Sequence, residues 1–372
     1  MKARVIAYYL PQYHPIPEND KYWGKGFTEW TNVTKAKPLF RGHHQPNLPA
    51  DLGFYDLRLP EIRKEQARLA KEAGIEGFCY WHYWFGNGKE LLERPFNEVV
   101  DSGEPDFPFC LGWANHEWST KTWTTNGSSK KIIAEMKYPG EEDYILHFNK
   151  YLKAFKDKRY ITVDDKLLFV IFAPMDMPDF PSFKKKWNEL AIQNGLKGFH
   201  FVGVRENFTV TNNTNTTKKH KYSLEAFNKK AIKQYNDVLH LGFDAVNSRG
   251  SIRANIKAKS LGIYYFKRLL TKMGIKTVVK CKYKDIIENY YVEQDKWENV
   301  YPTIIPNFDR SPRAGWNTNY LWYGSTPALF KKHVTQALTL LEKKSNEHKI
   351  LFLQSWNEWG EGNYMEPDLK FG

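Results

Sequence analysis

The amino-acid sequence predicts an α/β protein built as a (β/α)8 TIM barrel. Three observations predict it: eight short apolar runs recur along the chain, most of them lack polar alternation, and helical patterns lie between many of them. Apolar runs without alternation are typical of parallel strands that are buried on both faces. With 372 residues, of which 41% are hydrophobic, the chain is long enough for one large domain.

The expected strands follow one another at intervals that leave room for a helix between most neighbours. They span residues 4–10, 75–84, 107–115, 167–173, 198–204, 243–247, 300–308 and 349–356. Helices are expected at about 59–74, 141–157, 182–194, 224–239, 285–298 and 326–345. The first helix has the clearest pattern, because it is charged on one side, apolar at Ile62, Ala67 and Leu69, and followed by Gly74.

The end of the chain differs from a complete barrel. Only residues 357–372 follow the eighth expected strand, which is too few for a helix and an active-site loop together. Either the barrel closes without a full last helix, or the chain has been shortened. We expect residues 1–372 to form a single catalytic domain, with a variable basic insertion at 205–295 and a mobile polar loop at 209–221.

Positive charge is unevenly distributed along the chain. The net charge is +13, and residues 245–284 contain eleven Lys or Arg and no acidic residue. One interpretation is a solvated basic helix that packs through its apolar side. Another is a surface for anionic membrane headgroups or for a phosphate-bearing acceptor such as a lipid-linked glycan. No RNA-binding aromatic motif or zinc finger supports nucleic acid as a partner.

Cysteine content and hydropathy indicate the compartment. Cys79, Cys110 and Cys281 are odd in number and widely spaced, which argues against a disulfide framework and against a zinc site. The N-terminus has no apolar leader, and no apolar run reaches the roughly 20 residues that span a bilayer. We therefore expect a cytoplasmic protein, with peripheral contact at the inner membrane as the alternative location.

The sharpest functional signal is the stretch QSWNEWGEG at residues 354–362. Glu358 and Glu361 are three residues apart, so a turn can place both carboxyls on one side. Breaking an acetal requires a proton for the leaving oxygen and stabilisation of positive charge at the anomeric carbon, which two carboxyls can divide between them. Trp356 and Trp359 could raise one carboxyl pKa and form a platform for a sugar ring. The alternative is a surface turn with solvated glutamates.

Other polar and aromatic residues follow the expected strands, at the end of a barrel where active sites lie. The histidines show no spacing typical of a metal site, and an Asp-x-Asp triplet is absent, so we expect no metal and no cofactor. Glu358 and Glu361 are the candidate catalytic residues. The candidate substrate-binding residues are Tyr9, Gln12, His14, Glu29, Trp30, His82, Tyr83, Trp84, Asn115, Glu117, Trp118, Asn307, Asp309, Arg313, Asn357, Trp359 and Glu366.

Four blocks of sequence resemble the WbsX-type family of bacterial polysaccharide-biosynthesis proteins, which is related to glycoside hydrolase family 99, the endo-α-mannosidases. They are AYYLPQYHPIPENDKYWGKGFTEWTNV (7–33), GFCYWHYWF (77–85), FCLGWANHEWS (109–119) and WNEWGEGNYMEPD (356–368). The resemblance implies a (β/α)8 barrel in which Glu358 assists attack by the sugar's own 2-hydroxyl and Glu361 is the general acid and base. It also implies substrate contacts by the residues that match the family's other motifs, which are His82, Tyr83, Asn115, Glu117, Trp118 and Glu366.

The resemblance leaves the reaction open between glycosyl transfer and hydrolysis. Both reactions pass through an oxocarbenium-like transition state, and the acceptor, a sugar hydroxyl or water, decides the outcome. We expect an enzyme that acts on an α-linked glycan with a paired-glutamate retaining mechanism, most simply a transferase in O-antigen or capsule assembly. A family 99-like endo-acting hydrolase and a catalytically silent glycan-binding barrel are the alternatives.

Overall fold

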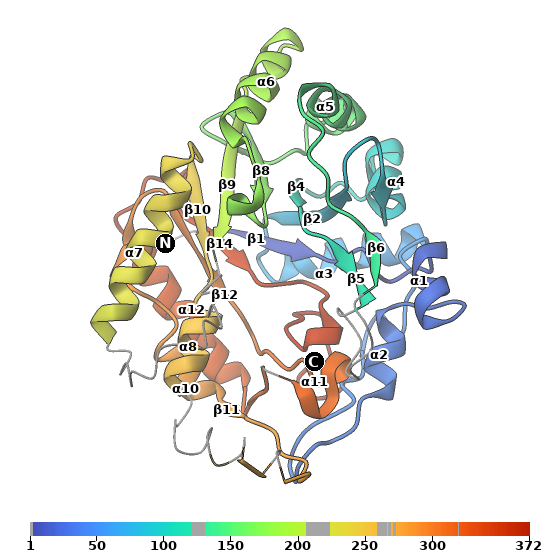
Figure 1. Ribbon diagram of the computed structural model, residues 1–372, viewed down its shortest axis with the longest axis vertical. Coiled ribbons are helices and arrows are strands. Elements are labelled where there is room, and N and C mark those ends of the chain that lie inside the picture. Colours follow the sequence, from blue (N-terminus) through green and yellow to red (C-terminus); the bar gives the residue numbers. More distant parts are fainter. Residues whose placement is uncertain are drawn as a thin grey trace.

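The computed structural model describes residues 3–120, 131–205, 224–258, 266, 269–270, 273–318 and 320–372. Within these residues, eight parallel strands form a closed barrel with helices around it (Figure 1). Each strand overlaps one of the expected runs, so the predicted (β/α)8 barrel is confirmed. The strands are β1 (Arg4–Tyr9), β2 (Gly77–Trp84), β4 (Phe109–Trp113), β8 (Lys166–Ile171), β9 (Phe199–Arg205), β10 (Ala245–Ser248), β12 (Val300–Ile304) and β14 (Ile350–Leu353).

The barrel closes through β1, which pairs with the last strand on one side and with β2 on the other. The register with β14 runs from Arg4 opposite Ile350 to Ala7 opposite Leu353. The register with β2 places Ile6 opposite Gly77. After β14 the chain forms the short 3-10 helix η5 (Trp359–Glu361). Closure is therefore complete without a full helix after the eighth strand, which was one of the two expected outcomes.

Most of the surrounding helices lie where the apolar periodicity predicts them. The range 285–298 differs, because the Asp295 carboxylate accepts the Val292 N–H at 2.8 Å and closes a tight turn there instead of a continuous helix. The sequence analysis did not anticipate α4, a helix of nine residues whose short pattern includes two β-branched valines. The helices are α3 (Pro60–Glu72), α4 (Arg94–Ser102), α5 (Glu141–Phe155), α6 (Phe180–Gln193), α7 (Leu224–His240), α8 (Ser251–Ala258), α10 (Tyr283–Ile287), η3 (Glu293–Lys296) and α12 (Pro327–Leu341).

Short elements build the mouth of the barrel. Helices α2 and α11 pack against each other and against η5, so segments from both ends of the chain meet there (Figure 1). The short elements are α1 (Pro17–Trp23), α2 (Glu29–Lys35), β3 (Glu90–Leu91), β5 (Trp118–Ser119), β6 (Ile132–Ala134), β7 (Thr162–Val163), η2 (Pro174–Asp176), β11 (Cys281–Lys282), α11 (Ser311–Ala314), η4 (Gly315–Asn317) and β13 (Trp322–Tyr323).

Side chains of each strand alternate between the barrel interior and the surrounding helices. Tyr8 points inward and stacks on Trp81, with 4.5 Å between ring centroids. Its neighbour Tyr9 points outward and donates a hydrogen bond to Gln66 Oε1 on α3 at 2.6 Å. Because successive residues face opposite sides of a strand, this alternation decides which side chains can reach the mouth.

An aromatic core fills the layer between the barrel and helices α5 and α6. Trp187 is fully buried there, and its ring centroid lies 4.5 Å from that of Phe183 and 4.8 Å from that of Phe169. Replacing a buried aromatic residue of this kind by Ala costs about 3–5 kcal/mol. Much of the high aromatic content therefore supplies core volume and holds the barrel strands in register.

The range 205–295 contributes to the barrel as well as to its surface. Strand β10 lies within it, and Arg249 and Arg253 of the basic segment are buried rather than exposed. The expected mobile loop at 209–221 lies outside the described residues. None of the described helices combines the length and the apolar character that a membrane span requires. Cys79, Cys110 and Cys281 are buried free thiols.

Candidate active site

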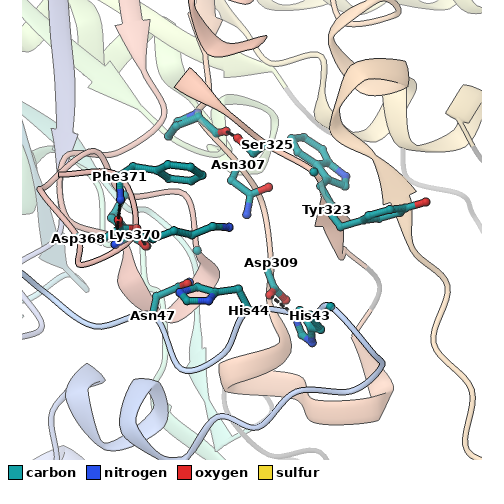
Figure 2. Close-up of a pocket in the computed structure, with 16 residues that line it drawn as sticks. His43, His44, Asn47, Asn307, Asp309, Tyr323, Ser325, Asp368, Lys370 and Phe371 are labelled. Carbon is teal, nitrogen blue, oxygen red and sulfur yellow. Dashed lines mark hydrogen bonds and ion pairs between the residues drawn. The ribbon is translucent and has the colours of Figure 1, made fainter. Parts of the chain in front are cut away.

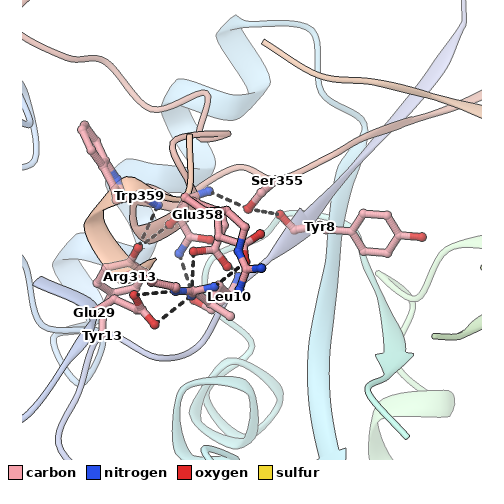
Figure 3. Close-up of polar contacts among 11 residues, drawn as sticks. Tyr8, Leu10, Tyr13, Glu29, Arg313, Ser355, Glu358 and Trp359 are labelled. Carbon is pink, nitrogen blue, oxygen red and sulfur yellow. Dashed lines mark hydrogen bonds and ion pairs between the residues drawn. The ribbon is translucent and has the colours of Figure 1, made fainter. Parts of the chain in front are cut away.

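Glu358 and Glu361 meet at one guanidinium at the mouth of the barrel, that of Arg313. Figure 3 shows this guanidinium between Glu358 and Glu29. Arg313 Nη2 donates to Glu358 Oε1 at 2.9 Å, and Arg313 Nη1 donates to Glu361 Oε1 at 2.8 Å. Arg310 Nε lies 3.0 Å from the same oxygen of Glu361. Both carboxyls line one cavity of about 200 Å³. The geometry therefore brings the candidate catalytic pair within reach of a single bound sugar.

A third carboxylate, Glu29, holds Arg313 from the opposite side. Its two oxygens accept hydrogen bonds from Arg313 Nη2 at 2.8 Å and from Arg313 Nε at 3.2 Å. Glu29 is fully buried. A Cβ at Gly360 would lie 2.2 Å from Glu29 Oε2, so only glycine lets the turn approach this ion pair. The guanidinium of Arg313 therefore binds three carboxyl groups. Its single positive charge is shared among them, so none of the three is fully neutralised by it.

This arrangement separates the acidities of the paired glutamates. Burial raises the pKa of Glu358 to about 8, in spite of the opposing charge of Arg313, and the negative charges of Glu361 and Glu29 add to the rise. Burial alone would also raise the pKa of Glu361, but Arg310 and Arg313 outweigh it and hold that pKa below its ordinary value. Of the two, Glu358 is therefore the carboxyl that holds a proton more readily, and Glu361 is the one that ionises first.

Aromatic side chains form much of the remaining cavity wall. Trp81 and Tyr83 come from alternate positions of β2, Trp118 from β5, and Phe172 directly follows β8. Arg249, just after β10, also lines the cavity, and its guanidinium carbon lies 4.7 Å from the centroid of the Tyr8 ring. Flat aromatic faces beside polar groups are suited to a sugar ring, which has apolar C–H faces and a polar rim.

Behind the turn, Glu366 is enclosed by neutral hydrogen-bond donors. Its Oε2 accepts from Trp359 Nε1 at 2.6 Å and from the Tyr55 hydroxyl at 2.9 Å, and its Oε1 accepts from Gln66 Nε2 at 2.6 Å. Tyr9 donates to the same glutamine. Burial raises the pKa of Glu366 to about 7. Tyr9, Trp359 and Glu366, which we expected to contact substrate, thus form a buried network that supports the turn.

The turn is also tied to the first strand. The Asn357 amide accepts from Leu10 N at 2.8 Å and donates to Leu10 O at 2.9 Å, in the manner of a strand neighbour. The Tyr13 hydroxyl donates to Asn357 O at 2.6 Å and accepts from Trp359 N at 3.1 Å. Asn357 was a candidate for substrate binding, but both of its polar side-chain atoms are engaged by the backbone. It positions Glu358 and Glu361 instead.

Strand alternation turns two other candidates away from the cavity. His82 and Trp84 occupy the outward positions of β2, between and after the cavity-lining Trp81 and Tyr83. His82 Nε2 lies 2.9 Å from His147 Nε2 on α5, and burial lowers the pKa of His82 to about 3, so its ring is neutral. Trp84 Nε1 donates to Asp143 Oδ2 at 3.0 Å on the same helix.

The remaining candidates lie in four places. Asn115 joins two strand ends, because its amide exchanges hydrogen bonds with the backbone of Ala173 at 2.7 and 2.9 Å. Asn307 and Asp309 line a second cavity (Figure 2). His14 is buried and Glu117 half-buried, both outside the lining of the first cavity. Trp30 stacks behind the turn, 5.5 Å from Trp359 between ring centroids. The candidates that do line the first cavity are Gln12, Tyr83, Trp118, Arg313, Glu358 and Glu361.

Part of the aromatic cavity wall comes from residues that the sequence analysis did not select. Trp356 and Trp359 were expected to form a platform for a sugar ring, but both are buried in the core. Trp81, Phe172 and Arg249 line the cavity instead. Arg249 directly follows the sixth strand, so reading the residue after every strand would have selected it. Trp81 lies inside a strand, and it differs from its neighbour His82 only in pointing into the barrel instead of outward.

A (β/α)8 barrel with paired glutamates at its mouth is typical of enzymes that act on carbohydrates, and solved structures share the fold. One is the GH99 endo-alpha-mannosidase from Bacteroides thetaiotaomicron in complex with bis-tris propane, at 13% identity, 98% coverage of this chain, 87% coverage of that chain and a TM-score of 0.51. Another is a glycoside hydrolase-like protein, at 14% identity, 99% and 87% coverage and a TM-score of 0.58. At these identities the likeness concerns the fold.

The chain belongs to the family described as Glycosyltransferase WbsX, whose model matches residues 5–372. It is 31% identical over 378 aligned positions to the uncharacterized protein WxcX of two strains of Xanthomonas campestris pv. campestris, ATCC 33913 and B100. The match covers all of this chain and 48% of each relative. The chain therefore spans about half the length of these curated relatives, and its family places it among carbohydrate-active enzymes.

Proposed function

We propose that this chain transfers a glycosyl unit, at an α-glycosidic bond, to a sugar hydroxyl during assembly of a bacterial surface polysaccharide. The observation that carries the proposal is the shared guanidinium: Glu358 and Glu361 both bind Arg313 and both line one aromatic-walled cavity. The family description, Glycosyltransferase WbsX, supports transfer as the reaction. The buried free cysteines are compatible with a reducing, cytoplasmic site of action.

The different pKa values of Glu358 and Glu361 suggest which residue is the acid and which stays ionised. Glu358 donates its proton to the leaving oxygen as the bond from that oxygen to the anomeric carbon breaks. Glu361 stays ionised and either stabilises the positive charge at that carbon or accepts the proton of the sugar's own 2-hydroxyl as it attacks. The acceptor hydroxyl then attacks the anomeric carbon and gives its proton to Glu358. Where the 2-hydroxyl had attacked first, its bond to that carbon breaks in this step and Glu361 returns the proton to the 2-oxygen. This division reverses the roles that the family resemblance implies, in which Glu361 is the acid.

Glu358→Gln and Glu361→Gln test the pair and its division of labour in one experiment. Each variant should lose about 10³-fold in kcat/KM on a natural α-glycan. A glycoside with a good aryl leaving group needs no protonation, so it should restore turnover to the variant that lacks the acid, which we expect to be Glu358→Gln. Restoration of Glu361→Gln instead would return the acid role to Glu361. Full activity in both variants would remove the pair from the mechanism.

Hydrolysis is the second candidate, and the fold shared with GH99 structures favours it. Product analysis with and without an added sugar acceptor separates the reactions. Transfer predicts that an elongated glycan accumulates at the expense of free sugar, whereas a hydrolase releases the same free sugar in both cases. A glycan that binds but is never turned over by wild-type protein would instead indicate a binding barrel.

We also propose that an exposed apolar and basic segment contacts anionic membrane lipid beside a lipid-linked glycan. Phe266, Leu269 and Met273 are 60, 55 and 67% exposed, unusually high values for large apolar side chains that occur so close together. They lie within residues 245–284, which lack acidic residues. Liposome sedimentation should recover more protein with anionic than with neutral vesicles, and Phe266→Ser/Met273→Ser should reduce that recovery. Equal recovery with both vesicle types would contradict the contact.

A further inference from the structure

A second cavity lies beside residues 358–362, the turn that carries Glu358 and Glu361 and that we call the catalytic turn. Figure 2 shows the side chains that line this cavity. Gly362 lines this cavity, whereas its neighbours Glu361 and Asn363 line the first one. The second cavity has a volume of about 130 Å³, against about 200 Å³ for the first. Its walls come from the loop at 42–47, the segment after β12 at 306–309, the segment 322–325, and the C-terminal segment 362–371.

Specific hydrogen bonds hold these four segments together. The Asp309 carboxylate accepts from His43 Nε2 and from Gln45 Nε2, both at 2.7 Å, and from the Ser311 N–H at 2.9 Å. His43 Nδ1 accepts from a backbone N–H, so its Nε2 carries the proton that Asp309 receives. The Asp368 carboxylate accepts from the Tyr364 hydroxyl and from two backbone N–H groups. Both acids are thus occupied in shaping the cavity.

Three other polar side chains of the cavity take no part in these hydrogen bonds. Among the described residues, no hydrogen bond or ion pair reaches the side chains of Asn47, Asn307 or Lys370. Asn307 Oδ1 is buried, and Lys370 Nζ lies 4.6 Å from the centroid of the Phe371 ring. In Figure 2 the Lys370 side chain extends toward Asn307, and Phe371 and Tyr323 lie on opposite sides of Asn307. A buried amide oxygen without a partner, as at Asn307, is costly, which is typical of sites whose partner is a ligand.

The chemistry of these groups identifies the class of ligand. Two amides offer a donor and an acceptor each, Lys370 offers donors, and Tyr323 and Phe371 offer ring faces. A hydroxyl-rich pyranose matches such a set, since each hydroxyl both donates and accepts. A phosphate would meet two lining carboxylates, Asp309 and Asp368, and a hydrocarbon would leave the amides unpaired.

We propose that this cavity is a second saccharide site, which holds one sugar unit of the glycan outside the reaction cavity. The proposal builds on the proposed function, because it takes the glycan as the ligand. The site is linked to the catalytic turn by Asp309, whose N–H donates to Glu361 O at 2.7 Å. Residues 361–363 border both cavities, so a sugar bound here lies next to the segment that carries Glu361. The site therefore extends glycan recognition beyond the sugar that reacts.

Binding can be measured without turnover. Glu358→Gln protein is titrated with methyl α-D-mannopyranoside, methyl α-D-glucopyranoside and methyl α-L-rhamnopyranoside, and ligand-observed NMR gives Kd. The same titrations are made after adding Asn47→Leu/Asn307→Leu, which should weaken binding at this site about tenfold for the hydrogen bonds lost. Asn346→Leu, an exposed substitution at the amino end of β14, is the matched control and should leave Kd unchanged. Lys370→Met, also exposed, should weaken binding without affecting folding.

The outcomes decide whether sugar binds at this cavity, independently of whether the enzyme turns over any glycoside. Binding that weakens in the double variant and in Lys370→Met supports the second site, whether or not the wild-type protein turns over any glycoside. Binding that is unchanged in both variants, or no binding of the three sugars, overturns it. Thermal unfolding of each variant identifies loss of fold. If the double variant unfolds, Lys370→Met alone decides the question.

Discussion

Two carboxyl groups in the segment after β14, those of Glu358 and Glu366, have raised pKa values, and only one of them has the surroundings of a reacting group. Burial raises the pKa of Glu358 to about 8 and that of Glu366 to about 7. Glu358 lines the cavity and binds a guanidinium that it shares with Glu361. Glu366 accepts hydrogen bonds from three neutral donors. A raised pKa alone therefore does not identify a catalytic carboxyl; access to a cavity and to a second, ionised carboxyl does.

Removing the guanidinium of Arg313 should have the largest effect on both stability and activity. In Arg313→Met, Glu29 is left buried without its partner, so the free energy of unfolding should fall by about 3–5 kcal/mol. The glutamate pair also loses its common anchor, and kcat/KM should fall about 10³-fold. Glycosyl transfer assays and denaturant titrations measure the two effects. Arg310→Met, which leaves Glu29 paired, is the control and should lose less of both; equal losses would contradict the central position of Arg313.

Glu366→Gln tests the second of these two carboxyls and should change the pH dependence of stability more than catalysis. The folded-state pKa is raised from 4.5 to about 7, so the stabilisation is fully present below pH 4.5 and is lost as pH rises through 7. The shift corresponds to about 3 kcal/mol. Between pH 5 and pH 8 the free energy of unfolding should therefore fall less in the variant than in wild type. A loss of kcat/KM as large as that of Glu358→Gln would place Glu366 in the reaction.

Glu29→Gln should sharpen the comparison by altering the charge around Glu358. The titratable groups that act on Glu358 include Arg313, Glu361, Glu29 and the hydroxyls of Tyr13 and Tyr83. Removing the charge of Glu29 leaves more of the Arg313 charge for Glu358, so its pKa should fall by about one unit. The alkaline limb of the profile of kcat/KM against pH should move down by the same amount. Glu72→Gln, exposed on α3, is the matched control; an unmoved limb in Glu29→Gln would contradict this coupling.

The sequence was sufficient for the barrel and for part of the site. Each of the eight strands was visible as an apolar run, because strands buried on both faces carry no competing pattern. The glutamate pair was visible because both residues lie in one turn. The sequence did not show which residues of a strand point into the barrel and which point outward. His82 and Trp84 were therefore selected, and Trp81 was missed. The ion pair of Glu29 with Arg313 joins residues 284 apart in the chain, and only the folded structure brings them together.

The most direct test of the account is a titration of glutamate side-chain carboxyl carbons by 13C NMR in wild type, Glu358→Gln, Glu361→Gln and Glu366→Gln. The account predicts two carboxyls that titrate well above the ordinary range, one near pH 8 and one near pH 7. The first should vanish in Glu358→Gln and the second in Glu366→Gln. A highest titration that persists in Glu358→Gln and disappears in Glu361→Gln would contradict the claim that Glu358 carries the proton of the pair.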